Sequence, residues 1–155
     1  MNFSDQTFLF DQFADSFLGM NYIVLQSARS FQLDKEEQLS LELLEEMFKV
    51  SDGSRHIDGT LEVCQFADAV KEINDVLGYQ ATRGGGIERC SNEELTRRQK
   101  IFWDIVQSQI SLPPKETYEH VAFHGSRLAF GIHWNFCYIF MNGNEGFVIA
   151  MDASD

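Results

Sequence analysis

The spacing of apolar and polar residues predicts amphipathic helices through the middle of the chain. One predicted helix begins at Asp34, which has the spacing of a capping box with Glu37, and its leucine-rich apolar face continues to about Val50. A second runs from Thr60, the N-cap, to Gly78, and its apolar side chains follow a regular 3.6-residue period. We therefore expect two helices here, joined by a short polar loop.

Two further helices are predicted on either side of this pair. Ser91 and Glu94 form another capping box, ahead of a third amphipathic helix. Near the N-terminus, phenylalanines crowd between Ser4, a suitable N-cap, and Gly19, a suitable helix end. Residues 20–31 form a brief apolar run that fits either a helix or a strand, and we favour a helix.

The pattern changes to that of strands near the C-terminus. Residues 120–152 are rich in aromatic and β-branched side chains, and Asn142 followed by Gly143 is the preferred pair for a two-residue type I′ hairpin turn. With that turn Tyr138 pairs with Phe147, and one face of the hairpin becomes strongly apolar. The members of this face are Trp134, Phe136, Tyr138, Phe147, Ile149 and Met151.

Helices first and strands last predict an α+β fold. With residues 120–124 and 127–132 as further strands, we expect four or five N-terminal helices packed on one face of a C-terminal three- to four-stranded antiparallel meander. A length of 155 residues suits a single domain, residues 1–155, with one hydrophobic core.

The charge of the chain indicates which classes of partner it can bind. The net charge is −12, and residues 34–75 hold twelve acids against four bases, whereas residues 83–100 hold five bases against three acids. An acidic surface repels nucleic acid and anionic membranes and favours basic proteins. The basic helix with Arg97, Arg98 and Lys100 can also pair with the acidic helix of a second copy, so a homodimer is a further expectation.

The sequence also indicates a cytoplasmic protein without a membrane span. No apolar run approaches the roughly 18 residues that cross a bilayer, and acids stand at the N-terminus where a signal peptide needs bases. The three cysteines are odd in number and lack metal-type spacing, which suits free thiols in a reducing compartment.

Three consecutive glycines at residues 84–86 suggest phosphate binding as one interpretation. A phosphate loop of the Walker type needs a buried strand before it and a Lys followed by Ser or Thr. Here a predicted helix precedes the glycines, and no such lysine follows them. We interpret the segment as a flexible connection between two helices.

Cys90 is the candidate for thiol chemistry. It directly precedes the N-cap Ser91, at the kind of helix start where reactive thiols are often found, and Arg89 adds positive charge. A nucleophilic cysteine also needs a positioned base. The candidate bases are His56, His120, His124 and His133. A cysteine-dependent hydrolase or transferase is therefore one alternative function.

His120 and His124 have the spacing with which a helix presents two zinc ligands. In a strand the same residues would lie roughly 13 Å apart, at about 3.3 Å per residue, which is too far for one metal ion. No cysteine pair and no HExxH glutamate completes a ligand set, so we expect no metal site.

The loop from Ser51 to Gly59, with its flanks, loosely resembles the EF-hand calcium-binding pattern. A predicted helix leads into the loop, and Phe66 starts the helix that follows it. With Gly59 as the sixth loop position, Gln65 stands where the bidentate glutamate is needed. The resemblance implies a degenerate EF-hand-like calcium module, which is a second alternative function.

The favoured function is protein binding, without catalytic residues or a cofactor. Small size, strong acidity and the lack of a coherent catalytic set are typical of inhibitor, antitoxin or immunity-type proteins that neutralise a basic partner such as a nuclease toxin. The candidate surface is the acidic segment 36–58. Its predicted partner-binding residues are Glu36, Glu37, Glu42, Glu45, Glu46, Asp52 and Asp58.

Overall fold

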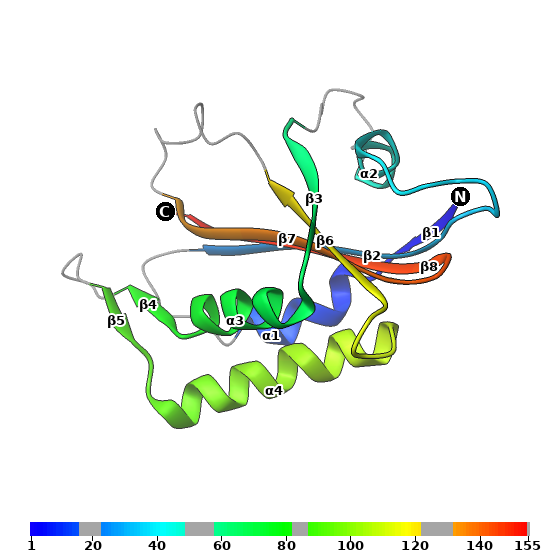
Figure 1. Ribbon diagram of the computed structural model, residues 1–155. Helices are drawn as coiled ribbons and strands as arrows, with labels where there is room; N and C mark the ends of the chain where they lie inside the picture. Colours follow the sequence, from blue (N-terminus) through cyan, green and yellow to red (C-terminus); the bar gives the residue numbers. More distant parts are fainter. Residues whose placement is uncertain (16–22, 49–57, 82–86, 122–131, 155) are drawn as a thin grey trace.

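A six-stranded antiparallel sheet runs through the middle of the molecule, with helices on both of its faces (Figure 1). The computed structural model describes residues 1–15, 23–48, 58–81, 87–121 and 132–154. The strand order is β1-β2-β8-β7-β6-β3, and each neighbouring pair is antiparallel. These strands are β1 (Asn2–Asp5), β2 (Ile23–Gln32), β3 (Thr60–Cys64), β6 (Glu116–Val121), β7 (Ile132–Asn142) and β8 (Glu145–Ser154).

The helices divide unequally between the two faces of the sheet. Figure 1 shows α2 above the sheet and α1, α3 and α4 below it. Their bounds are α1 (Asp11–Asp15), α2 (Leu41–Met47), α3 (Phe66–Leu77) and α4 (Asn92–Gln109), and a 3-10 turn, η1 (Thr7–Phe10), precedes α1. A separate two-stranded sheet, β4 (Tyr79–Ala81) with β5 (Ile87–Arg89), lies between α3 and α4 in the chain.

The predicted arrangement of helices and strands is wrong in two respects, although the α+β class is confirmed. The sheet has six strands instead of three or four, and β1, β2 and β3 come from the part of the chain predicted to be helical. The helices also do not share one face, because α2 packs on the side opposite α1, α3 and α4.

β2 shows the physical reason for the first error. It occupies most of the apolar run for which a helix was favoured, and it pairs with β8 along ten residues. Val24 and Ala28 of β2 are buried in the core between the sheet and α1, α3 and α4. A short apolar run has no decisive period, so pairing with a distant strand determines its conformation. The predicted N-terminal helix is likewise replaced by β1, η1 and the short α1.

The β7–β8 hairpin has the predicted loop length but a turn one residue further on. Asn142 pairs with Glu145, so Gly143 and Asn144 form the turn. Gly143 has φ of +68°, and no described residue other than glycine has a positive φ, as a type II′ turn requires. Tyr138 consequently faces Ile149 instead of Phe147. A shift of two residues keeps every side chain on its face, so the predicted apolar face is confirmed.

The middle helices start later than predicted. Residues 60–64 form β3 instead of the first turns of a helix, and α3 begins at Phe66 and ends at Leu77, with Gly78 as its C-cap. α2 is capped by Ser40, whose hydroxyl accepts a hydrogen bond from the N–H of Leu43 at 3.3 Å. The capping box predicted at Asp34 forms only an isolated turn. By contrast, Ser91 caps α4 as expected.

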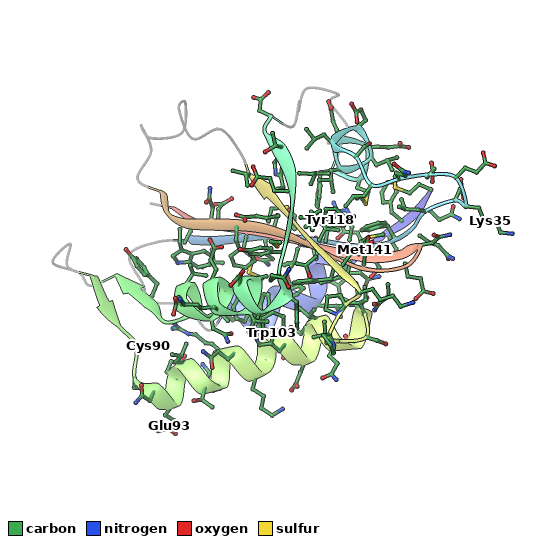
Figure 2. All side chains as sticks on the ribbon, in the orientation of Figure 1. Lys35, Cys90, Glu93, Trp103, Tyr118 and Met141 are labelled. Atoms are coloured by element: carbon green, nitrogen blue, oxygen red, sulfur yellow. The ribbon has the colours of Figure 1, made fainter. Side chains whose placement is uncertain are left out.

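Aromatic side chains form the core between the sheet and its three helices. Phe102 of α4 is fully buried, with its ring centroid 5.7 Å from that of Phe10 and 6.1 Å from that of Phe136. Trp103 donates its indole N–H to Asn74 at 2.8 Å, which ties α4 to α3. Figure 2 shows Trp103 on the side of α4 that faces the sheet. The aromatic face of the hairpin is therefore buried because α1, α3 and α4 cover it.

The core on the α2 side is smaller and mainly aliphatic. Leu44 and Met47 of α2 pack against Ile139 and Val148 of the sheet. Met141 belongs to the same cluster and lies at the end of the sheet near α2 (Figure 2). This contact holds the acidic helix α2 on the sheet.

Two predictions fall partly outside the described residues. The glycine triplet at residues 84–86 lies there, and its flanks form the β4–β5 pair, so the connection between α3 and α4 includes a small hairpin. The strands predicted at 120–124 and 127–132 are described only where they overlap β6 and β7.

Candidate protein-interaction surfaces

The predicted acidic surface lies beside and on α2. Glu36 and Glu37 precede the helix, whereas Glu42, Glu45 and Glu46 belong to it. Glu36, Glu42 and Glu46 are exposed, and Glu37 and Glu45 are half-buried. We call these five residues the α2 surface. Asp52 lies outside the described residues, and Asp58 is exposed immediately before β3.

Two carboxylates of the α2 surface, those of Glu37 and Glu42, are stabilised by hydrogen-bond donors of the protein itself. Glu37 accepts a hydrogen bond from the backbone N–H of Asp34 at 2.8 Å and lies 3.0 Å from the Met1 amino group, and both contacts lower its pKa. The backbone N–H of Glu42 and the hydroxyl of Ser40 lower the pKa of Glu42. These charges therefore already have favourable partners within the chain.

Arg29 of β2 fixes the end of α2. Its Nε donates to the carbonyl oxygen of Met47 at 3.2 Å, and its guanidinium lies 5.1 Å from the centroid of the Phe48 ring. The same side chain donates to Asp5 at 2.8 Å. A cation bound to the last carbonyl groups of a helix also complements the helix dipole. Arg29 thus positions α2 relative to β1 and β2.

A second group of carboxylates, which sequence reasoning missed, lies where β3, β6 and α3 meet. Glu62 of β3 is directly opposite Glu119 of β6 in the sheet. Burial raises the pKa of Glu119, and the nearby carboxylates of Glu72 and Glu62 raise it further. Like charges directly opposite each other destabilise a sheet. We call Glu62, Asp68, Glu72 and Glu119 the acidic edge.

Two neighbouring side chains respond to the carboxylates of the acidic edge. Tyr138 is 2% exposed, its hydroxyl donates to Glu72, and burial followed by that carboxylate raises its pKa. Burial raises the pKa of Cys64 to about 11, with further contributions from Glu119, Asp68 and Glu72. At neutral pH the phenol and the thiol therefore keep their protons.

The sequence did contain a weak indication of the acidic edge. Residues Thr60 to Val63 alternate polar and apolar, as a half-buried strand does. Four alternating residues also fit the start of a helix, and the strong period of α3 extended the predicted helix back over them. On a helix Glu62 would have been one more solvated carboxylate, whereas in β3 it faces Glu119.

β3 is one of the two edge strands of the six-stranded sheet. Thr60, Glu62 and Val63 are exposed, and Val63 retains 74% of its accessible surface. A hollow of about 260 Å³ adjoins the C-terminal end of the strand. Its lining residues are Val63, Cys64, Gln65, Phe66, Pro114, Lys115, Glu116, Thr117 and Tyr118.

The basic helix predicted as a dimer contact uses its charges within the chain. Arg98 is 1% exposed and donates to the carbonyl oxygen of Leu77 at 3.1 Å. Arg97 binds Glu94 at 2.8 Å, and Lys100 pairs with Asp104 one turn further along α4. The arrangement stabilises α4 and its contact with α3.

The residues proposed for chemistry are not brought together in the described part of the chain. Cys90 lies beside the start of α4 (Figure 2). It is 8% exposed, and its N–H donates to the carbonyl oxygen of Gly78 at 3.0 Å. His120 lies 2.7 Å from the carbonyl oxygen of Asp58, and the side chains of the other three histidines are outside the described residues. Among described residues, no group of three His, Cys, Asp or Glu could hold a metal ion. None of the described helices is long and apolar enough to cross a membrane.

Comparison with known proteins identifies a similar fold. Neither a protein-family model nor a curated protein sequence matches the chain. Two crystal structures of citrus MAF1 are similar to it, one with a TM-score of 0.52 and 12% sequence identity over 94% of this chain and 97% of the MAF1 chain. The other has a TM-score of 0.50 and 11% identity over 94% and 98% of the two chains. At such low identity, the similarity concerns the fold alone.

Proposed function

We propose that this protein is a cytoplasmic protein-interaction domain that binds a basic protein partner through its acidic surfaces. Its most concrete form is an inhibitor or immunity-type protein that neutralises a basic enzyme such as a nuclease toxin. The observation that carries the proposal is the acidic edge, where Glu62 faces Glu119 beside Glu72. A net charge of −12 supports the same choice of partner.

The energetic argument concerns the state of these carboxylates before binding. In the free protein the charge of Glu119 is disfavoured by burial and by its neighbours. A lysine or arginine of a partner would place a positive charge beside these carboxylates, so its binding would relieve the repulsion. The α2 surface would add long-range attraction that accelerates association at low ionic strength.

The two alternative functions have fewer supporting observations. Cys90 is buried, and the structure describes no histidine beside it. Residues 51–57 of the EF-hand-like loop lie outside the described residues, and the segment after Gly59 is β3. Binding of a basic protein therefore has the stronger support.

Affinity purification on the immobilised protein tests the proposal. The protein should retain a specific basic protein from lysate of the source organism at low salt, and added salt should slow its association. Two charge-reversed baits identify the surface: one carries Glu42, Glu45 and Glu46 replaced by Lys, the other Glu62 and Glu119 replaced by Lys. Retention of only acidic or neutral proteins, or equal retention by all three baits, would overturn the proposal.

A further inference from the structure

β3 is an edge strand of the sheet, and among the described residues its outer edge is open to another strand. β3 ends the six-stranded sheet, and no further described strand pairs with its outer side. The exposure of three of its five side chains agrees with an open edge. An exposed edge presents unpaired backbone N–H and C=O groups, to which an extended peptide can add as a new strand.

The side chains of β3 point alternately to two chemically different surroundings. Cys64 packs with the aromatic core on the α3 side, and Glu62 shares that side with Glu119. Leu61 packs with the aliphatic core on the α2 side, which it shares with the exposed Val63. An added strand would alternate in the same way, so the residues that it places beside Glu62 differ from those beside Val63.

We propose that β3 binds an extended segment of the basic partner as a seventh strand, in which basic residues on the α3 side alternate with apolar residues on the α2 side. This inference rests on the proposed function, which makes the partner basic. Backbone hydrogen bonds would provide affinity, and the alternating side chains would provide selectivity. The hollow beyond Cys64 could receive one further side chain of the segment.

A second copy of this chain is a poor occupant of the same edge. Pairing two β3 strands would bring two acidic edges together, and like charges across a sheet are unfavourable. The other end strand, β1, differs in this respect, because its carboxylate Asp5 already binds Arg29 at 2.8 Å. Of the two edge strands of the sheet, β3 is therefore the one whose carboxylates favour the addition of a basic strand.

A synthetic peptide provides the test. The probe is acetylated and amidated Lys-Val-Lys-Val-Lys, and the matched control peptide has Glu in place of each Lys. We expect the lysine peptide to bind and to slow hydrogen exchange of the backbone amides of β3, while the glutamate peptide does neither. Binding of the lysine peptide without protection of the β3 amides would overturn strand addition and leave the proposed function standing.

Two matched protein variants separate strand addition from general attraction. Glu62→Lys should weaken binding of the lysine peptide by about tenfold or more, whereas Glu46→Lys, the same charge change on the exposed face of α2, should weaken it by only about twofold. Glu62→Lys also places opposite charges across from each other at Glu119, so it should fold at least as stably as the parent. Equal losses in the two variants would overturn the assignment to β3.

The natural partner distinguishes failure of this inference from failure of the proposed function. A purified basic partner that binds the parent and Glu62→Lys equally would overturn strand addition alone. If neither the lysine peptide nor any basic protein binds the parent at low salt, the proposed function fails together with the inference. Loss of partner binding in Glu62→Lys, with β3 amides protected in the parent complex, would support both.

Discussion

Glu37 and Glu42 of the α2 surface and Glu119 of the acidic edge are similar carboxylates in opposite electrostatic conditions. At the α2 surface, backbone N–H groups and a hydroxyl lower the pKa values of Glu37 and Glu42. At the acidic edge, burial and two neighbouring carboxylates raise the pKa of Glu119. The number of acids in a segment therefore does not locate the place where a cation is most needed. The surroundings of each carboxylate do.

This difference predicts unequal roles in binding. A partner's cation at the α2 surface would compete with hydrogen bonds that already stabilise the charge. At the acidic edge it would replace a repulsive arrangement with an attractive one, which contributes more to affinity.

The largest expected effect follows directly from this comparison. Replacing Glu62 and Glu119 together by Lys should weaken binding of the basic partner by about tenfold to a hundredfold, whereas replacing Glu42, Glu45 and Glu46 by Lys should weaken it by about threefold. Titration calorimetry of both variants at one salt concentration measures the two losses. A greater loss in the α2 variant would reverse the ranking of the two surfaces.

A large effect on stability is expected at Arg29. Arg29→Met removes the donor to Met47 and the ion pair with Asp5, so the free energy of unfolding should fall by about 2 kcal/mol and Tm by about 5 °C. Because the change loosens α2 but leaves the acidic edge intact, partner affinity should change little. Arg97→Met, at a half-exposed position of α4, should alter the free energy of unfolding by less than about 0.5 kcal/mol. Differential scanning calorimetry compares the two variants.

A smaller effect of opposite sign is expected at the acidic edge. Glu119→Gln removes a charge that burial and its neighbours disfavour, so at neutral pH it should raise the free energy of unfolding by about 0.5 kcal/mol after solvent screening. The folded-state pKa of Glu119 lies above its ordinary value of 4.5. The parent therefore loses stability as the pH rises through that pKa, and the variant does not. Urea unfolding across pH 3.5 to 8 should show the two curves converging below about pH 4.5.

The smallest effect is expected at the α2 surface. The pKa of Glu37 lies below its ordinary 4.5, so its contribution to stability is present above that pH and is lost as the pH falls through the folded-state pKa. Glu37→Gln should therefore be slightly less stable than the parent at neutral pH and equal to it in acid. The same urea series measures this difference. A Glu37 variant that gains stability at neutral pH would contradict the contrast between the two surfaces.

Local patterns predicted the parts of the fold that depend on neighbouring residues. α4 begins after Ser91 as its capping box indicates, and the β7–β8 hairpin keeps its predicted faces because the turn moved by one residue and the pairing by two. The predicted acidic segment also lies at the surface for Glu36, Glu42 and Glu46. In each case the residues that determine the structure lie within a few helical turns or one hairpin of each other.

The errors arose where distant segments decide the structure. β2 is a strand because β8 pairs with it, and residues 60–64 form β3 because β6 does so. Neither pairing can be read from the period of a short segment. The acidic edge was missed for the same reason, since Glu62 and Glu119 are 57 positions apart in the chain (119 − 62 = 57) and meet only through that register.

The position of β8 between β2 and β7 has a consequence for how the chain is made. Ile23 pairs with Ser154, a residue synthesised 131 positions later (154 − 23 = 131). While the ribosome is still extending the chain, the β2 segment has no β8 beside it and lacks the pairing that makes it a strand, so its apolar residues stay uncovered. The sheet can close only after its central hairpin has emerged, so chaperones have a long interval in which to bind the nascent N-terminal strands.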